Sequence, residues 1–298
     1  MLCATNLQKG VDNMSLDISQ RIRFSYGRFS KGHKKIANVI LNDYDKAADM
    51  TAAKLGKLVG VSESTVVRFA NLLGYEGYSE FQHAVSELVR TKLTPIQRIE
   101  ITKKRLGRSN LLEKVMESDI AKIKYTKENL DNDAFYNTVD AMLTAKTIYI
   151  MGARSTEPVA KLLYYNLSMI FDNVKFIEPK STAEVFEQMF NIGKSDILVA
   201  FSFPRYSSMM INAVKYATES QAKVAVITDS DISPLVEYAT YLLIAQSDMA
   251  AFMDSLVAPI SIINAMIVEI TNRREKEITE RFDKLEKVWD EYRVYAKR

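Results

Sequence analysis

The chain has 298 residues, of which 47% are hydrophobic and 26% are charged. This length favours two domains of ordinary size, and the composition excludes a disordered or collagen-like chain. A single cysteine, Cys3, excludes a disulfide framework, and two histidines leave little for a histidine-based metal centre. We therefore expect a protein of a reducing compartment that has no cofactor and no metal site.

The formal net charge of +3 conceals an uneven distribution. Residues 1–108 carry 18 Lys and Arg against 10 Asp and Glu, whereas residues 109–298 carry 22 against 27. The first part therefore has a net charge of +8 and the second a net charge of −5. This asymmetry favours a nucleic-acid-binding part joined to a different part, although basic residues can also serve only to solubilise helix faces.

Targeting and membrane signals are absent from the sequence. Residues 1–14 are polar and lack the apolar segment of a secretory signal, so we expect a loose tail there. The longest uncharged run, residues 255–268, is shorter than the roughly 20 residues that a membrane helix needs. We expect a cytoplasmic protein without a membrane partner.

Residues 15–90 form the first predicted domain, because apolar residues recur there at helical spacings of three and four. Gly60 can adopt the left-handed conformation of a tight turn between two helices, and Ser62 is a favourable N-cap for the second helix. The apolar residues expected to form a small core around this turn are Leu55, Val59, Val61, Val66 and Phe69. The pattern predicts an all-α helix-turn-helix bundle, although helical hairpins with a glycine turn also occur without a binding function.

The start of the second helix in such a motif is where recognition helices meet base edges and phosphates. The residues that we expect to contact DNA are Ser62, Ser64, Thr65 and Arg68. Gly56 stands where such motifs usually carry alanine, which weakens the first helix. Residues 91–110, which follow the domain, are polar and basic and contain Pro95 and Gly107, so they predict a linker.

From residue 111 onward the pattern changes. A helical stretch over residues 111–143 is followed by short runs rich in β-branched residues that alternate with helical segments. The predicted strands cover residues 147–151, 174–177, 197–201, 224–227 and 241–245. This alternation predicts a three-layer α/β domain over residues 111–275, with a central five-stranded parallel sheet covered on both faces.

The last segment, residues 276–298, is charged and amphipathic and predicts a C-terminal helix. Its apolar face carries Phe282, Leu285, Val288 and Trp289. We expect this face to pack either in an assembly or on its own subunit.

Two turns that follow predicted strands have the composition of anion sites. Residues 152–156 and residues 202–208 each place small hydroxyl residues between a strand and the start of a helix, where backbone N–H groups favour phosphate. Ligands of open α/β sheets bind outside the carboxyl ends of the strands, so the two turns are expected to converge. The alternative is that the hydroxyl residues only cap helices.

Two segments carry a resemblance to a known family. Residues 55–77 resemble the N-terminal domain of RpiR-type bacterial transcriptional regulators, and the most specific part reads SESTVVRFANLLGYEGYSEF. Residues 147–272 are similar to the sugar-isomerase (SIS) domain that these regulators carry. The resemblance implies a non-enzymatic regulator that binds double-stranded operator DNA and senses a phosphorylated sugar. A phosphosugar isomerase is the alternative, although nothing marks Glu157 or Asp254 as a catalytic base.

The two turns depart from the family pattern in an informative way. The first reads GARST instead of GxGxS, and the second reads SFPRYS instead of SxSGxT, so Arg154 and Arg205 replace glycines. The expected effector-binding residues are Gly152, Arg154, Ser155, Thr156, Ser202, Arg205 and Ser207. We expect the two arginines to contact phosphate or carboxylate, and an effector with a second acidic group would fit them. The alternative is that each arginine pairs with a neighbouring residue or points to solvent.

The resemblance also implies an assembly. Recognition of operator half-sites and SIS assembly both favour symmetry, so we expect a homodimer or homotetramer. Effector binding is expected to favour one arrangement of this assembly and thereby to change the spacing of the two recognition helices.

Overall fold

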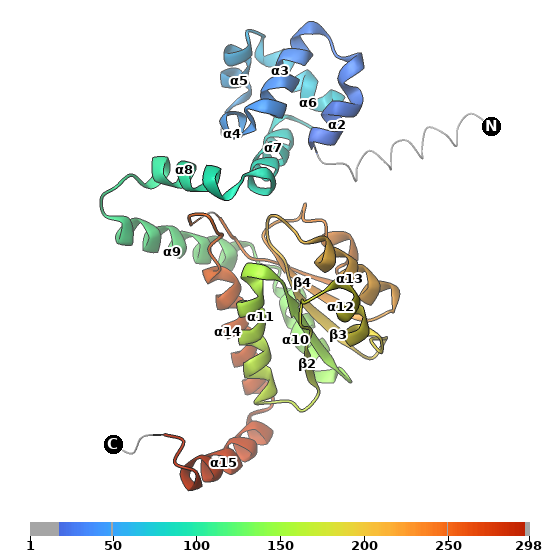
Figure 1. Ribbon diagram of the computed structural model, residues 1–298, viewed down its shortest axis with the longest axis vertical. Coiled ribbons are helices and arrows are strands. Elements are labelled where there is room, and N and C mark those ends of the chain that lie inside the picture. The colour runs from blue at the N-terminus through green and yellow to red at the C-terminus, as the bar shows by residue number, and fades with distance from the viewer. Residues whose placement is uncertain (1–17, 49, 249, 296–298) are drawn as a thin grey trace, which may run out of the picture. The chain divides into compact units, whose positions relative to one another are not determined.

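The computed structural model describes residues 18–48, 50–248 and 250–295 (Figure 1). The tail expected over residues 1–14 lies outside the described residues. The chain divides into two compact units, residues 1–94 and residues 95–298. We describe each unit by itself.

The first unit is helical, as predicted. Its helices are α2 (Ile18–Ser25), α3 (Lys31–Asn42), α4 (Tyr44–Ala47), α5 (Ala52–Val59), α6 (Glu63–Leu72) and α7 (Tyr78–Lys92). Three of them start at a hydroxyl residue, Ser30, Thr51 or Ser62, whose side chain accepts a backbone N–H of the first turn. The ring of Phe69 packs edge-on against Phe29 at 5.2 Å and Phe81 at 5.8 Å between centroids, so α6 is anchored in an aromatic core.

The segment expected as a linker, residues 91–110, differs from that expectation. Helix α7 runs to Lys92, and a further helix, α8, spans Pro95–Leu106 and belongs to the second unit. Proline is well tolerated at the first helical position because its missing N–H would have no helical partner there. Pro95 therefore starts a helix instead of interrupting one, and the boundary between the units falls just before it.

The second unit contains the predicted five-stranded parallel sheet. Its strands are β1 (Ile148–Gly152), β2 (Val174–Phe176), β3 (Ile197–Phe201), β4 (Lys223–Thr228) and β5 (Tyr241–Ile244). All neighbours pair in parallel, in the order β2-β1-β3-β4-β5. The chain proceeds from β1 to one edge and then returns to the other side of β1, so the strand order reverses between β1 and β3.

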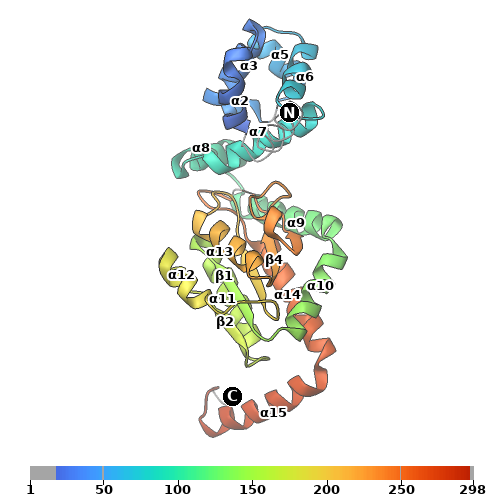
Figure 2. The same ribbon diagram turned by 90° about the vertical axis from the view of Figure 1, so that its right-hand side faces the viewer.

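Helices cover both faces of this sheet, which confirms the predicted three layers (Figures 1 and 2). Ile148, Ile150 and Val199 point toward the face that is covered by α10 (Asn132–Thr144), α11 (Glu157–Ser168) and α14 (Val257–Arg273). Tyr149 and Leu198 point toward the face that is covered by α12 (Thr182–Met189) and α13 (Ser208–Glu219). Strands with both faces covered are apolar throughout, which explains the continuous hydrophobic runs in the sequence.

Two further helices complete the second unit. Helix α9 (Leu111–Asn129) packs against α14, whereas α15 (Glu275–Glu291) extends away from the sheet layers (Figures 1 and 2). Ile278 is the one buried residue of α15, and Val288 on its predicted apolar face is 48% exposed. Phe282, Leu285 and Trp289 are half-buried, so the described part of its own subunit covers this face only in part. Across the described ranges, no helix combines the length and apolarity needed to cross a membrane.

Candidate functional site

The turn of the helix-turn-helix motif has the predicted geometry. Gly60 ends α5 with a left-handed φ of 69°, and the Val61 N–H donates to the carbonyl of Gly56 at 2.9 Å. Ser62 caps α6, because its hydroxyl accepts the N–H of Thr65 at 3.3 Å. The turn expected at Gly60 and the helix cap expected at Ser62 are thus confirmed.

The geometry of this turn explains why residue 56 is a glycine. A Cβ at this position would lie 2.8 Å from the carbonyl oxygen of Val61, which is too close for any side chain. The glycine therefore permits the close approach of the turn to α5, and its low helix propensity is secondary. Of the predicted core, Leu55, Val66 and Phe69 are fully buried, whereas Val59 and Val61 are half-buried.

The four residues expected to contact DNA form one cluster at the start of α6. The Ser62 hydroxyl lies 3.0 Å from that of Ser64 and 2.8 Å from that of Thr65, and Arg68 Nε donates to the Ser64 carbonyl at 3.2 Å. Ser62, Ser64 and Arg68 are exposed, and Thr65 is half-buried. Hydroxyl groups and a guanidinium at a helix N-terminus are suited to phosphate and base-edge contacts.

A histidine beside this cluster makes the stability of the first unit depend on pH. His33 on α3 lies 5.6 Å from the Phe69 ring between centroids, and burial together with the Arg68 charge lowers its pKa below 6.5. His33 therefore binds a proton more readily in the unfolded chain than in the folded chain. The contribution of neutral His33 to the free energy of unfolding is fully present above pH 6.5, and it is lost as the pH falls through the lower pKa of the folded state.

We expect His33→Gln to flatten this dependence. Amide hydrogen exchange of α3 and α6, measured from about pH 8 to about pH 5, should show a smaller loss of stability in the variant than in the unmodified chain. His83→Gln, which alters an exposed histidine on α7, is the control and should retain the full dependence. Equal pH dependence in all three proteins would contradict the role of His33.

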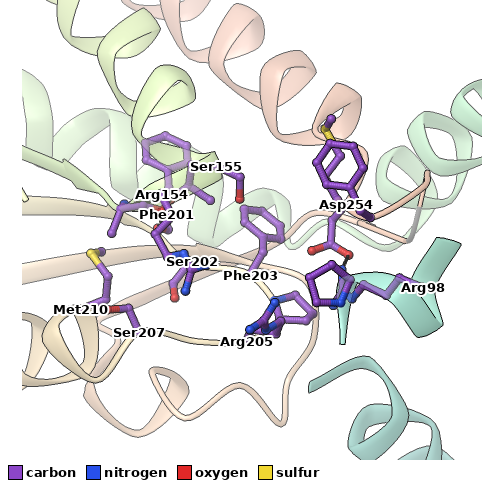
Figure 3. Close-up of a pocket in the computed structure, with 16 residues that line it drawn as sticks. Arg98, Arg154, Ser155, Phe201, Ser202, Phe203, Arg205, Ser207, Met210 and Asp254 are labelled. Carbon is purple, nitrogen blue, oxygen red and sulfur yellow. Dashed lines mark hydrogen bonds and ion pairs between the residues drawn. The ribbon is translucent and has the colours of Figure 1, made fainter. Parts of the chain in front are cut away.

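A cavity of about 240 Å³ lies at the carboxyl ends of β1 and β3 (Figure 3). Its lining residues are Pro95, Arg98, Ala153, Arg154, Ser155, Thr156, Phe201, Ser202, Phe203, Pro204, Arg205, Ser207, Met210, Phe252, Met253 and Asp254. Six of the seven residues expected to bind an effector are among them. The cavity stands where the strand order reverses, which is the general place for ligands in open α/β sheets.

The turn after β1 supplies one wall of the cavity. Arg154 has a left-handed φ of 59°, and both Arg154 and Ser155 are exposed. The hydroxyl of Thr156 is already engaged, because it accepts the Ala153 N–H at 3.0 Å and lies 3.0 Å from the Phe201 carbonyl, to which it can donate. The Thr156 side chain thus joins the turn to the end of β3. Arg154 and Ser155 are the other polar side chains of the turn that line the cavity.

The turn after β3 supplies the facing wall. Ser202 is buried, with 4% of its surface exposed, and Arg205 is exposed with a left-handed φ of 68°. Ser207 is the N-cap of α13, yet its side chain makes no capping hydrogen bond. Helix α13 begins at the cavity, so the N–H groups of its first turn favour an anion there. At the start of α11, by contrast, the Glu157 N–H donates to the Arg154 carbonyl and Pro158 has no N–H.

Gly152 does not line the cavity, and packing explains its position. A Cβ on Gly152 would lie 2.6 Å from the Thr156 carbonyl oxygen and 2.8 Å from the Ala160 Cβ. The glycine therefore allows α11 to start directly against the end of β1.

Replacing Gly152 with alanine should displace the start of α11 and destabilise the second unit by about 1–3 kcal/mol, as overpacking does. Urea unfolding followed by circular dichroism measures the loss. Gly193→Ala in the same unit is the matched control, because the nearest atom to its added Cβ lies 4.0 Å away. A Gly152→Ala protein as stable as the control would show that this contact can relax at no cost.

The third wall of the cavity contains Asp254, which was considered from the sequence, and Arg98, which was not. Arg98 on α8, 2% exposed, donates through an Nη atom to the Asp254 carboxylate at 2.9 Å, and Asp254 is 10% exposed. Figure 3 shows this pair on the side of the cavity opposite Ser207 and Met210. The partners are 156 residues apart in the sequence, and Arg98 falls within the segment assigned as linker, so no local signal could have joined them.

The electrostatics of the cavity suit anion binding better than proton transfer. Its lining contains three arginines and one carboxylate, Asp254, which is already paired with Arg98. No histidine is among the lining residues in the described part of the chain. Glu157, the other carboxylate considered from the sequence, pairs with Lys161 at 2.7 Å outside the lining.

The protein combines a helix-turn-helix unit with a five-stranded α/β unit. This combination places it in the class of two-domain transcriptional regulators rather than enzymes. Residues 16–92 match the helix-turn-helix domain of the rpiR family, and residues 141–269 match the SIS domain; together these matches cover more than half of the chain. The chain belongs to the RpiR family of helix-turn-helix and SIS proteins, as the resemblance predicted.

Similar proteins support this assignment. The chain is 26% identical to an "Uncharacterized HTH-type transcriptional regulator" of Thermotoga maritima, over 76% of this chain and 81% of that protein. It is 23% identical to the HTH-type transcriptional regulator HexR of Escherichia coli, over 93% of this chain and 96% of HexR. Among solved structures, the Vibrio vulnificus NanR protein complexed with ManNAc-6P shares the fold, with a TM-score of 0.60, 20% identity and coverage of 94% of this chain and 99% of NanR.

Proposed function

We propose that the chain is a sequence-specific DNA-binding regulator whose SIS domain binds a phosphorylated sugar and thereby alters operator binding. The observation that carries the proposal is the cavity at the carboxyl ends of β1 and β3, lined by arginines and serines, in a chain that also has a helix-turn-helix unit. NanR, which has the same fold, is complexed with the sugar phosphate ManNAc-6P, and this agrees with a similar ligand here.

The DNA-binding half of the proposal assigns recognition to the start of α6. Ser62, Ser64, Thr65 and Arg68 lie together there. The first unit, residues 1–94, has 13 Lys and Arg against 9 Asp and Glu, and its net charge of +4 favours a polyanion. Fluorescence anisotropy with a duplex selected from a random-sequence library tests this half. The logarithm of the association constant should fall linearly with the logarithm of the salt concentration. A chain that selects no duplex at low salt would overturn this half of the proposal.

The sensing half assigns the phosphate to the two turns at the cavity. A ligand at 100 times its dissociation constant stabilises its folded protein by about 2.7 kcal/mol, so a thermal-shift screen of sugar phosphates should find one. Stabilisation by none of a panel of five- to seven-carbon sugar phosphates would overturn this half. Interconversion of an aldose phosphate and a ketose phosphate by the chain would instead favour the isomerase alternative.

The proposal includes a homodimer or homotetramer. The apolar face of α15 is only partly covered within the described part of its own subunit, and a symmetric assembly fits two operator half-sites. Light scattering of the chain after Val288→Glu, which charges this face, should show a shift toward monomer. A monomeric unmodified chain would contradict the assembly.

A further inference from the structure

We infer that the effector carries two separate anionic groups, one held by the turn after β1 and the other by the turn after β3. Its chemical class is a phosphorylated sugar with a second acidic group, either a carboxylate or a second phosphate. This inference rests on the proposed function and specifies the ligand of the same cavity.

The first observation is that the two turns repeat the same set of groups. After β1 come the guanidinium of Arg154 and the hydroxyl of Ser155; after β3 come the guanidinium of Arg205 and the hydroxyl of Ser207, followed by the start of α13. Both arginines have a left-handed backbone, with φ of 59° and 68°, at positions where a glycine would be unstrained. Each turn thus holds its own guanidinium and hydroxyl, which together form one anion-binding half-site, and the turn after β3 adds the N–H groups at the start of α13.

The second observation is that no residue in the described part of the chain neutralises either guanidinium. Arg154 and Arg205 make no side-chain hydrogen bond or ion pair with the described residues, whereas the third arginine, Arg98, is paired with Asp254. Ser202 also lines the cavity and is 4% exposed, and its hydroxyl has no hydrogen-bond partner among the described residues. The Ser202 hydroxyl is therefore available to a polar ligand in the cavity.

These observations favour two anionic groups over one. A phosphomonoester with a charge of about −1.5 to −2 is accommodated by one guanidinium, one hydroxyl and the N–H groups of one helix start. A single phosphate would therefore satisfy one turn and leave the cation of the other turn without a counter-ion. A second acidic group at the far end of the same sugar satisfies both turns.

Isothermal titration of the full chain with matched ligands tests the inference. Glucose 6-phosphate and 6-phosphogluconate differ by a carboxylate, and fructose 6-phosphate and fructose 1,6-bisphosphate differ by a phosphate. The member with two acidic groups should bind about tenfold or more tightly in at least one pair, because it makes an additional charge-assisted contact. The pair that shows the difference identifies the second group.

Glycine substitutions provide the matched variants. Arg154→Gly and Arg205→Gly should each reduce the affinity for the ligand with two groups to that of its single-phosphate counterpart. Because glycine relieves the left-handed strain, each variant should also melt about 2–4 °C higher, which excludes misfolding as the cause of the loss.

Two results overturn the inference and are distinguishable. In the first, the single-phosphate sugars bind as tightly as both ligands with two acidic groups, and neither glycine variant changes any affinity. This result overturns the inference and leaves the proposed function intact. Binding of no member of either pair or of the wider sugar-phosphate panel overturns both.

Discussion

Replacing Asp254 with alanine should lower the free energy of unfolding of the second unit by about 3–5 kcal/mol, the range found when one member of a buried ion pair is removed. Arg98 is 2% exposed, so the variant would leave its guanidinium charge buried without the carboxylate that it contacts at 2.9 Å. We also expect α8 to exchange its amide hydrogens faster, because this ion pair joins α8 to the segment before α14. Urea unfolding followed by circular dichroism measures the loss of stability.

The same helix offers a matched control for this prediction. Arg105 and Asp248 also join α8 to the segment before α14, at 2.8 Å, but their side chains are 40% and 38% exposed. Asp248→Ala should therefore cost only about 0–1 kcal/mol. Replacing both buried partners with apolar residues, Arg98→Met with Asp254→Leu, should recover much of the loss. Equal stability of the Asp254→Ala and Asp248→Ala proteins would show that burial does not determine the effect.

Replacing Thr65 and Arg68 together with alanine should weaken binding of the selected duplex by about 2–4 kcal/mol, or roughly 30- to 1,000-fold. Both side chains lie at the start of α6, where the recognition helix is expected to meet the bases. Fold stability should change little, because Arg68 is exposed and the Ser62 cap of α6 is retained. Anisotropy titrations at fixed salt measure the affinity.

A loss of positive charge alone could mimic this result, and Arg23→Ala provides the control. Arg23 is an exposed residue of α2, and its replacement changes the net charge of the first unit by the same amount as Arg68→Ala. The control should weaken binding to all duplexes slightly and equally, whereas the recognition-helix variant should also lose its preference for the selected sequence. A similar effect of both variants would place the recognition surface elsewhere.

The features that the sequence predicted well are those that local rules determine. The left-handed turn at Gly60 and the cap at Ser62 depend on single residues and their immediate neighbours. The five strands were evident because strands covered on both faces are continuous apolar runs. The convergence of the two turns followed from a general rule for the carboxyl ends of parallel strands.

The features that the sequence did not reveal depend on contacts between distant segments. Pro95 was interpreted as part of a linker, although it starts a helix whose Arg98 pairs with Asp254. Thr156 was expected to face the ligand, whereas its hydroxyl lies within hydrogen-bonding distance of the backbone of Phe201 on the neighbouring strand. Gly56 was interpreted as a weakness of α5, and only the position of the Val61 carbonyl shows why a side chain is excluded.

The central claim is that ligand binding in the cavity is coupled to DNA binding, and one titration tests it most directly. The affinity of the chain for the selected duplex is measured with and without the sugar phosphate that gives the largest thermal shift. We predict a change of at least about fivefold, the lower end of typical coupling between sites. A chain with Arg154→Gly and Arg205→Gly should bind the duplex equally well and should not respond to the ligand. The same duplex affinity with and without saturating ligand in the unmodified chain would contradict the account.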